Sequence, residues 1–582
     1  MCGIIAYTGM QEAYPILYNG LTKLEYRGYD SAGIAVLHNS QLTINKKEGE
    51  VVNLSENQLI GTQGIAHTRW ATHGPATTAN AHPHTTHDNK ITIVHNGIIE
   101  NYKEIKEQLH AQGYTFKSDT DTEVLLNLIH SKPGDLQQKV VMALKEVVGA
   151  YGIVVLDNTG SMIAAKNGSP LALGIGKNEL YIASDPVAFL EHTRRVLYLE
   201  DGDIVKCTRD TYEFVEGDTR SEQQLTLSVS DIQKDGHEHF MHKEICEQVD
   251  SLAQTFAGKI REGTVKVSSN FSQDYVSILE HVLIIGCGTS YHAGLLLQDY
   301  IKELTSINTT VQLASDIDVR CLPKRTLVVA ISQSGETADT LNALKECKTK
   351  GFRTFGIVNV VGSTIAREVE SGIYIHAGPE ISVASTKAFS GQTLAGLIFA
   401  LHLRDLQGKP LDKQLLDAIQ VLPEHVQHVI EREHEFESIA KHVATQNSCY
   451  YLGRGTDVIV SKEAALKLKE ISYVHAEAYS SGEMKHGPIA LIQPGFPIIS
   501  TGDHHKLHSN IEECKARHAH TIHLGTHPCS IAHTQVLLPK THSLLQPIVY
   551  SVAHQLIAYH TAKVRECSID KPRNLAKTVT VE

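Results

Sequence analysis

The chain has 582 residues, and its 53 Lys and Arg face 65 Asp and Glu, which gives a formal net charge of −12. This acidic balance argues against a general nucleic-acid-binding surface. No apolar run approaches the ~18–20 residues of a membrane helix, and the start lacks the basic and apolar regions of a signal peptide. We therefore expect no nucleic-acid partner and no membrane partner, and a length well beyond one hydrophobic core predicts several domains.

The cysteines indicate the cellular compartment of the protein, and the histidines indicate whether it binds a metal. The ten cysteines are scattered without a C-x-x-C pair, which favours reduced thiols in the cytoplasm over a disulfide framework. His82, His84 and His87 lie close together, but in a loop-like stretch, and we identify no second cluster at ligand spacing. We predict a cytoplasmic protein without a structural metal.

The first residues hold a possible nucleophile, Cys2. If Met1 is removed, the thiol and a free α-amine stand on the same residue. A thiol titrates near pKa ~8.5 and an α-amine near ~7.7–8.0, so the amine can accept the thiol proton close to neutral pH. The apolar run from Gly3 to Tyr7 predicts a buried strand that would hold this end rigidly. On these residues alone, an ordinary N-terminus with a small second residue stays an open alternative.

Residues 2–217 predict one layered domain in which strands and helices mix. The strand-like runs are Gly33–Leu37, Gly64–His67, Ile91–His95, Ala150–Leu156 and Leu180–Ala183, and the helix-like stretches lie near Asn101–Gln112 and Thr122–His130.

Four polar clusters punctuate these strands, at residues 24–33, 66–74, 95–101 and 118–123. Segments that follow strands are where site residues tend to lie. Each cluster also has an ordinary explanation: Asn96-Gly97 is a turn signal, and residues 118–121 suit a helix N-cap.

Together with Cys2, these clusters resemble the class II glutamine amidotransferases, whose glutaminase domain is a layered αββα N-terminal-nucleophile fold. The resemblance implies that Cys2 attacks the side-chain amide of glutamine, with Asn96 and Gly97 as the oxyanion hole. It further implies that Arg69 clamps the substrate α-carboxylate and Asp121 pairs with the α-ammonium. The other implied residues are Thr72 and His73 at the pocket border, Arg27 in support, and Trp70, the only tryptophan, which would guard the path of ammonia.

The loop at residues 74–84 departs from the pattern of these relatives. It resembles their glutamine-covering loop, and its Asn80-to-His84 end matches. Pro75, however, stands one position earlier than the proline of the relatives. We therefore expect the glutamine-covering loop to be present. Because its proline is shifted, the resemblance defines its closed conformation less well.

Residues 218–245 change to a polar character and predict a linker. Beyond it, an apolar run ending in Gly-x-Gly-Thr occurs twice, at residues 282–289 and 449–456. Each copy reads as strand, tight turn and helix, the opening of a doubly wound α/β unit. This recurrence predicts two similar parallel-sheet domains, at 270–410 and 440–572.

A second strand of the first α/β domain runs into Ser332-Gln333-Ser334-Gly335-Glu336-Thr337 and then a helix. Hydroxyl groups and backbone N–H groups at a helix N-terminus suit a phosphate, although an ordinary Ser/Thr-rich N-cap fits the same residues. The P-loop pattern G-x-x-x-x-G-K-[ST] is absent. A phosphorylated small molecule is the better interpretation.

These features resemble the sugar isomerase (SIS) domains, which bind phosphosugars. With the glutaminase domain in front and the stretches at 383–387 and 570–577, the resemblance narrows to the glutamine–fructose-6-phosphate aminotransferases, or glucosamine-6-phosphate synthases. It implies that the sugar phosphate is bound by Thr289, Ser290, Ser332, Gln333, Ser334 and Thr337, with Ser385 nearby.

The helix-like run at 463–471 places Lys467 and Glu470 on one face, where spacing alone suits a solvated ion pair. By resemblance, Glu470 shuttles the proton between C1 and C2, and Lys467 is its catalytic neighbour. His486 would assist opening of the sugar ring in the adjacent subunit, which implies a homodimer. Lys577, in the tail at 573–582, would form a Schiff base with the open-chain ketose, for which its amine must be neutral.

The expected activity is transfer of the amide nitrogen of L-glutamine to D-fructose 6-phosphate, with isomerisation to D-glucosamine 6-phosphate. No cofactor is implied. Three rivals remain open: a glutamine-dependent enzyme with another acceptor, a sugar-phosphate deaminase, and a non-enzymatic sugar-phosphate sensor.

Overall fold

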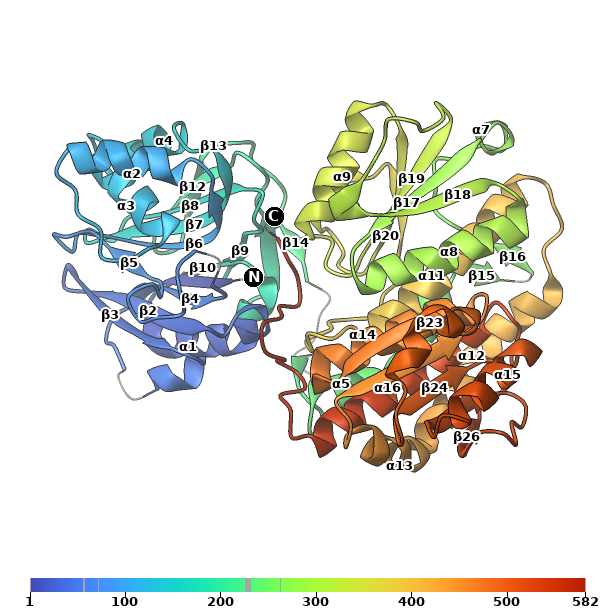
Figure 1. Ribbon diagram of the computed structural model, residues 1–582. Helices are drawn as coiled ribbons and strands as arrows, with labels where there is room; N and C mark the ends of the chain where they lie inside the picture. Colours follow the sequence, from blue (N-terminus) through green and yellow to red (C-terminus); the bar gives the residue numbers. More distant parts are fainter. Residues whose placement is uncertain (1, 56–57, 72, 226–231, 262, 581–582) are drawn as a thin grey trace. The chain divides into compact units, whose positions relative to one another are not determined.

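The computed structural model describes residues 2–55, 58–71, 73–225, 232–261 and 263–580. The chain divides into two compact units (Figure 1): the first comprises Met1–Ile232 and Ala576–Glu582, and the second comprises Gln233–Leu575. None of the helices in the described ranges combines the length and the apolar character that a bilayer crossing requires.

The first unit is built on two antiparallel sheets. Strand β1 (Gly3–Thr8) is buried along its whole length between two neighbours, which confirms the strand predicted after Cys2. The first sheet has the order β14 (Gln223–Gln224), β11 (Arg195–Tyr198), β9 (Ala172–Ile175), β10 (Leu180–Ala183), β1, β4 (Gln63–Arg69), β2 (Ser31–His38), β3 (Gln41–Glu48). The second has the order β13 (Tyr212–Glu216), β12 (Ile204–Cys207), β8 (Met162–Asn167), β7 (Gly149–Asp157), β6 (Ile91–Ile99), β5 (His84–Thr85).

Alternation of side chains along the strands creates four layers. Ile4 and Ala6 of β1 pack in the core between the two sheets, whereas Ile5 and Tyr7 pack against α1 (Ala13–Leu24). The outer face of the second sheet is covered by α3 (Asp121–Ser131) and α4 (Leu136–Leu144), with α2 (Tyr102–Ala111) beside them. Figure 1 shows these helices on one side of the stacked sheets and α1 on the other. The predicted αββα arrangement is confirmed.

The second unit contains two five-stranded parallel sheets with the same topology. The first half has the order β18 (Asn308–Leu313), β17 (His281–Gly286), β19 (Thr326–Ser332), β20 (Arg353–Val358), β21 (Ser371–Tyr374). The second half has the order β23 (His475–Ser480), β22 (Ser448–Gly453), β24 (Pro497–Thr501), β25 (His520–Gly525), β26 (Thr534–Leu537). In both halves the strand order is second, first, third, fourth, fifth, which confirms the predicted repeat of doubly wound units.

Helices cover both faces of each sheet, as doubly wound sheets require. In β17, Val282 and Ile284 enter the large core that the halves share, and Leu283 and Ile285 face α9 (Ala338–Thr349). The shared core also holds α11 (Lys387–Leu406) and α16 (Gln546–Val564), which are buried on nearly all sides. The remaining helices are α5 (Phe240–Cys246), α6 (Gln248–Phe256), α7 (Gln273–Ser277), α8 (Thr289–Thr305), α10 (Thr364–Glu368), α12 (Lys413–Glu431), α13 (Glu433–Val443), α14 (Asp457–Ser472) and α15 (His505–Lys515).

The segment predicted as a linker, 218–245, holds β14 near its start and most of α5 at its end. Residues 226–231 of that segment lie outside the described ranges. The two units therefore meet in sequence within it, at Ile232 and Gln233.

We predict that Phe399→Ala in α11 destabilises the second unit. The Phe399 ring is fully buried and stacks on Phe355 with ring centroids 4.2 Å apart, so its removal leaves a cavity that costs about 3–5 kcal/mol. Calorimetric unfolding should show the lower transition temperature. The matched control is Val564→Ala, at a side chain that is 45% exposed, which should stay within about 0.5 kcal/mol of the parent. Equal stability of the two variants would contradict this packing.

Candidate functional site

Cys2 lies at the start of β1, where the neighbouring strand β4 ends. The backbone N–H of Trp70 donates to Cys2 Sγ at 3.3 Å, and the next residue, Gly3, donates its N–H to Thr68 Oγ1 at 3.1 Å. Burial raises the pKa of the Cys2 thiol above its ordinary value, although the Trp70 amide and Arg69 act in the opposite direction. A thiol with a raised pKa needs a base before it can act as a nucleophile.

Asn96, on β6, is held with its amide group toward Cys2. Asn96 Nδ2 donates to the carbonyl oxygen of Cys2 at 2.9 Å. Its Oδ1 lies 3.1 Å from His67 Nε2, which also lies 3.0 Å from the carbonyl oxygen of His95. Both oxygens are acceptors, so Nε2 carries the hydrogen and the ring fixes which way the Asn96 amide points.

His67 is a site residue that sequence reasoning missed. Burial lowers its pKa to about 3, so the ring is neutral at physiological pH and keeps one N–H to donate. Its place on β4 within the polar cluster at 66–74 was visible in the sequence, but its contact with Asn96 depends on how the two sheets stack.

Gly97 follows Asn96 with a φ of +134°. A Cβ at this position would lie 2.0 Å from the carbonyl oxygen of Ala150 on the neighbouring strand. Only glycine fits this backbone.

Arg69, at the end of β4, is 3% exposed and bound to the loop that follows it. Its guanidinium donates to the carbonyl oxygens of His73, of Gly74 at 3.2 Å and of Pro75 at 3.1 Å. The carboxylates of Asp30 and Asp121 act electrostatically on it. A substrate carboxylate would have to replace some of the loop carbonyls around Arg69.

The other residues expected around glutamine are placed as follows. Asp121 is in the first turn of α3 and accepts the backbone N–H of Ile99 at 2.8 Å. Arg27 forms an ion pair with Asp185 at 3.1 Å. The His73 ring lies edge-on to Tyr102, Trp70 is half-buried, and Thr72 lies outside the described residues.

In the second unit, both predicted phosphate-binding turns lie at the carboxyl ends of adjacent strands. Thr289 begins α8 directly after β17, and the turn from Ser332 to Thr337 joins β19 to α9. The neighbouring pair β17 and β19 is where the strand order of this half reverses, and ligands of doubly wound folds bind at that point.

The turn after β19 has a fixed backbone. Ser332 Oγ accepts the N–H of Gly335 at 3.0 Å, and Ser334 Oγ accepts the N–H of Glu336 at 3.1 Å. Gly335 has a φ of +67°, and a Cβ there would lie 1.9 Å from Ser363 Oγ. Gln333, Ser334 and Thr337 are half-buried at the turn.

Two more residues of the expected phosphate set lie near the start of α11. Ser290 Oγ accepts Nε2 of Gln392, on α11, at 3.0 Å. Ser385 is half-buried two residues before α11 begins. The hydrogen bond between Gln392 and Ser290 thus links α11 to the start of α8, just after strand β17.

A buried charged network connects α8 with α14. Lys467 Nζ lies 2.7 Å from Glu470 Oε2, 3.5 Å from Glu463 Oε1 and 3.0 Å from Thr289 Oγ1. Glu463 also accepts from Thr289 at 3.0 Å and lies 2.7 Å from His292. The pair predicted from spacing is therefore formed, with Lys467 buried and the Glu470 side chain 20% exposed.

This network sets the charges of its members. Burial lowers the pKa of Lys467, but the carboxylates of Glu470 and Glu463 outweigh it and leave the pKa above its ordinary value. Burial raises the pKa of Glu463, and Lys467, His292 and Thr289 bring it below its ordinary value. A raised pKa favours the charged form of Lys467, which is not the form that attacks as an amine.

Glu463 and His292 were not identified from the sequence. The i,i+4 spacing of Glu463 and Lys467 was a usable signal. For His292 the sequence offered no such signal, because its partner Glu463 is on another helix. A cavity of about 340 Å³ borders the network, lined by Gly288, Tyr291, His292, Leu313, Lys462, Ala465, Leu466, Lys469 and Ala478.

His486 and Lys577 belong to other segments of the chain than this network. His486 is exposed at the end of a 3₁₀ helix, η6 (Ser481–His486), and within the described ranges no hydrogen bond or ion pair links it to Lys467 or Glu470. Lys577 is half-buried and belongs to the first unit. The chain leading to it is anchored on the second unit, where Arg573 lies 4.1 Å over the Tyr473 ring at the end of α14.

The SIS domain model matches residues 279–402 and 442–565, and the glutamine amidotransferase domain model matches residues 67–191. The chain is 43% identical to the glutamine–fructose-6-phosphate aminotransferase (isomerizing) of Chlorobaculum tepidum, over all of both chains. The chain belongs to the glutamine–fructose-6-phosphate aminotransferase family. The relative from Thermus thermophilus is also 43% identical over both full chains. The C-terminal domain of the glucosamine–fructose-6-phosphate aminotransferase of Francisella tularensis is a similar solved structure, with 33% identity and a TM-score of 0.55, covering 58% of this chain and all of that one.

We predict that His67 is a positioning residue for Asn96, the residue expected to stabilise the oxyanion. His67→Leu leaves the Asn96 amide free to rotate, so kcat for glutamine hydrolysis should fall at least about 10-fold, since one oxyanion donor is worth about 10²–10³, while KM changes little. His67→Gln, which retains a side-chain N–H, should recover part of the rate. An equal fall of kcat in His67→Leu and His67→Gln, or a change in KM alone, would contradict this role.

Proposed function

We propose that this chain transfers the amide nitrogen of L-glutamine to D-fructose 6-phosphate and isomerises the ketose to an aldose, giving D-glucosamine 6-phosphate and L-glutamate. The observation that carries the proposal is the full-length match to relatives of that name, which combine a glutamine amidotransferase domain and two SIS domains in one chain. The reaction involves no redox or phosphoryl transfer and calls for no cofactor.

In the glutamine half, Cys2 becomes the first residue when Met1 is removed. Its α-amine takes the thiol proton, and Sγ attacks the side-chain amide carbon to form a thioester and release ammonia. Asn96 Nδ2 and the Gly97 N–H stabilise the oxyanion. The position of the Asn96 amide beside Cys2, at 2.9 Å from its carbonyl oxygen, supports this role.

Arg69 and Asp121 hold the α-carboxylate and α-ammonium of glutamine. Their electrostatic interaction, together with their burial, supports a shared pocket. We further propose that His73 borders that pocket, together with Thr72, which lies outside the described residues. Arg27 supports it from a distance, through its ion pair with Asp185, and Trp70 guards the exit of ammonia.

In the sugar half, the phosphate is held by Thr289, Ser290 and the turn from Ser332 to Thr337, with Ser385 nearby. Glu470 is the one carboxylate of the buried network with an exposed side, 20% of its side chain, which suits a group that moves a proton between C1 and C2. Lys467 holds Glu470 in place through their contact at 2.7 Å. Lys577 forms the Schiff base with the open-chain ketose.

His486 assists ring opening in the site of a second copy, so the active form is a homodimer in the cytoplasm. Its exposure supports this assignment, because an exposed side chain is available to a partner. A sugar-phosphate deaminase or a sugar-phosphate sensor does not need a nucleophile that attacks glutamine. The ordered surroundings of Cys2 therefore argue against both rivals.

We predict that Lys577→Arg abolishes amino-sugar formation and spares glutamine hydrolysis, because arginine stays protonated and forms no imine. The parent should form glutamate and glucosamine 6-phosphate in equal amounts, and borohydride with fructose 6-phosphate should label the peptide that contains Lys577. The control is Lys540→Arg at an exposed site, which should retain both products. Unchanged synthesis in the Lys577 variant would contradict the Schiff-base assignment. Absence of amino sugar from the parent would contradict the proposed function itself.

A further inference from the structure

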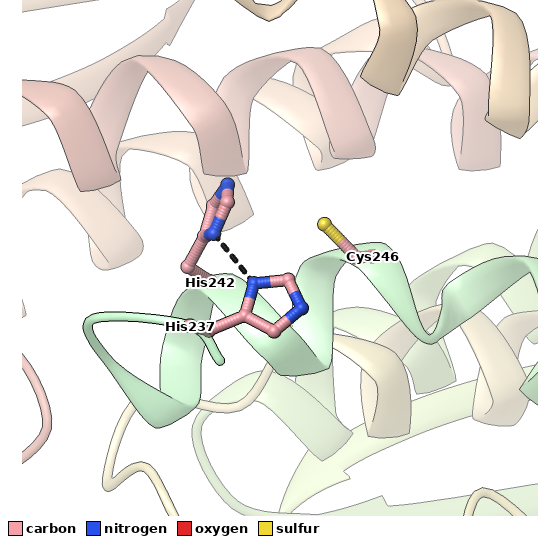
Figure 2. Close-up of side chains that lie close together, drawn as sticks. All are labelled: His237, His242 and Cys246. Carbon is pink, nitrogen blue, oxygen red and sulfur yellow. Dashed lines mark hydrogen bonds between the residues drawn. The ribbon is translucent and has the colours of Figure 1, made fainter. Parts of the chain in front are cut away.

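Three metal-ligating side chains converge at the start of the second unit. Figure 2 shows His237, His242 and Cys246 pointing toward one another. The Nδ1 atoms of the two imidazoles lie 2.8 Å apart, and one ligand atom from each of the three residues lies within 4.8 Å of the others. None of these residues takes part in the proposed reaction.

Local structure explains the convergence. His242 and Cys246 are four residues apart on α5, so they share one face of the helix. Asp235 and Gly236 both have positive φ, at +48° and +83°, and the His237 N–H donates to the Lys234 carbonyl oxygen at 2.9 Å. This turn brings the His237 ring back to the first turn of α5.

A carboxylate behind His242 completes the arrangement. His242 Nε2 lies 2.9 Å from Glu433 Oε1, and His560 Nε2 lies 2.7 Å from the same oxygen. A carboxylate only accepts, so His242 Nε2 carries the hydrogen and the lone pair of its Nδ1 faces His237 and Cys246. Metal-bound histidines characteristically donate their second N–H to a carboxylate in this way.

The spacing suits a small tetrahedral ion. Zinc bonds of about 2.0–2.1 Å to nitrogen and about 2.3 Å to sulfur place ligand nitrogens about 3.3 Å apart and nitrogen and sulfur about 3.6 Å apart. The imidazoles would separate by about half an ångström and the thiol would approach by about 1 Å at most. All three residues are half-buried, which leaves a path for the ion.

We propose that His237 Nδ1, His242 Nδ1 and Cys246 Sγ bind one Zn²⁺ ion, with water as the fourth ligand. This departs from the sequence-based expectation of no structural metal, which overlooked the H-x₄-H-x₃-C spacing. The ion ties the turn at His237 to α5, and through Glu433 and His560 it steadies the contact of α5 with α13 and α16.

Binding requires two changes in protonation. The Cys246 thiol loses its proton as the ion binds, because the thiolate is the form that binds metal. The hydrogen between the two imidazoles leaves His237 Nδ1, and that ring becomes the Nε2–H tautomer. One proton is therefore released per ion, and affinity rises with pH.

A second cluster of the same ligand types serves as the internal comparison. His508, His523 and Cys529 also have ligand atoms within 4.8 Å of one another. His523 Nδ1 contacts the Ser500 hydroxyl at 3.1 Å, so its partner is a hydroxyl and not a carboxylate. We assign the ion to the first cluster.

The test is a Co²⁺ titration of the metal-free, full-length chain, followed by absorption spectroscopy. A Cys2→Ala background excludes chelation by the N-terminal thiol and amine. One equivalent of Co²⁺ should produce visible bands and a thiolate-to-cobalt charge-transfer band, and Zn²⁺ should displace it. Cys246→Ser should lose the charge-transfer band and Cys529→Ser should retain it.

Two further variants keep the test decisive if a cysteine variant folds poorly. His237→Gln, in the half-exposed turn, should bind Co²⁺ at least about 10-fold more weakly, and Glu433→Gln should weaken binding about 10–100-fold through His242. A band that survives Cys246→Ser, that disappears only in Cys529→Ser, or that never forms with excess Co²⁺ would overturn the proposal.

Discussion

The buried ammonium group of Lys467 is the interaction on which the second unit depends. Its side chain is 1% exposed, and an unpaired charge at that depth would cost several kcal/mol. Glu463, Glu470 and Thr289 offset this cost through their contacts with Lys467. Helix α14 of one half and helix α8 of the other must therefore keep their relative positions. The same pairing holds Glu470 in place, and the Glu470 side chain is 20% exposed whereas that of Glu463 is 2% exposed. Packing and proposed proton transfer thus have one physical origin.

The two halves of the second unit share a topology but not a charge pattern. In the second half, Asp457 lies after β22, and a Cβ on Gly502, after β24, would be 1.9 Å from its carboxylate. Burial and the nearby Asp503 raise the pKa of Asp457 to about 7. Acidic side chains therefore fill the position that corresponds to the turn from Ser332 to Thr337 in the first half. This difference in charge supports the proposal that the first half, rather than the second, binds the phosphate.

Periodicity and turn signals were enough to predict the elements that position both sites. The strand after Cys2, the helices near Asn101 and Thr122 and the repeat of doubly wound sheets were all predicted from the sequence. Of the missed residues, His67 and His292 act through partners far away in the chain. Their roles depend on sheet stacking and helix contact, which no local pattern encodes. Glu463 did carry a local signal, its i,i+4 spacing to Lys467. The binding of Arg69 to loop carbonyls was likewise invisible without coordinates.

The proposed transfer from glutamine requires that ammonia made at Cys2 reacts with the sugar before it exchanges with ammonia in solvent, where it would be protonated at neutral pH. The most direct measurement uses glutamine labelled with ¹⁵N in its side-chain amide, fructose 6-phosphate, and a large excess of unlabelled ammonium. The account predicts glucosamine 6-phosphate with the full ¹⁵N enrichment of the glutamine. Dilution of the label in proportion to the ammonium pool would contradict it.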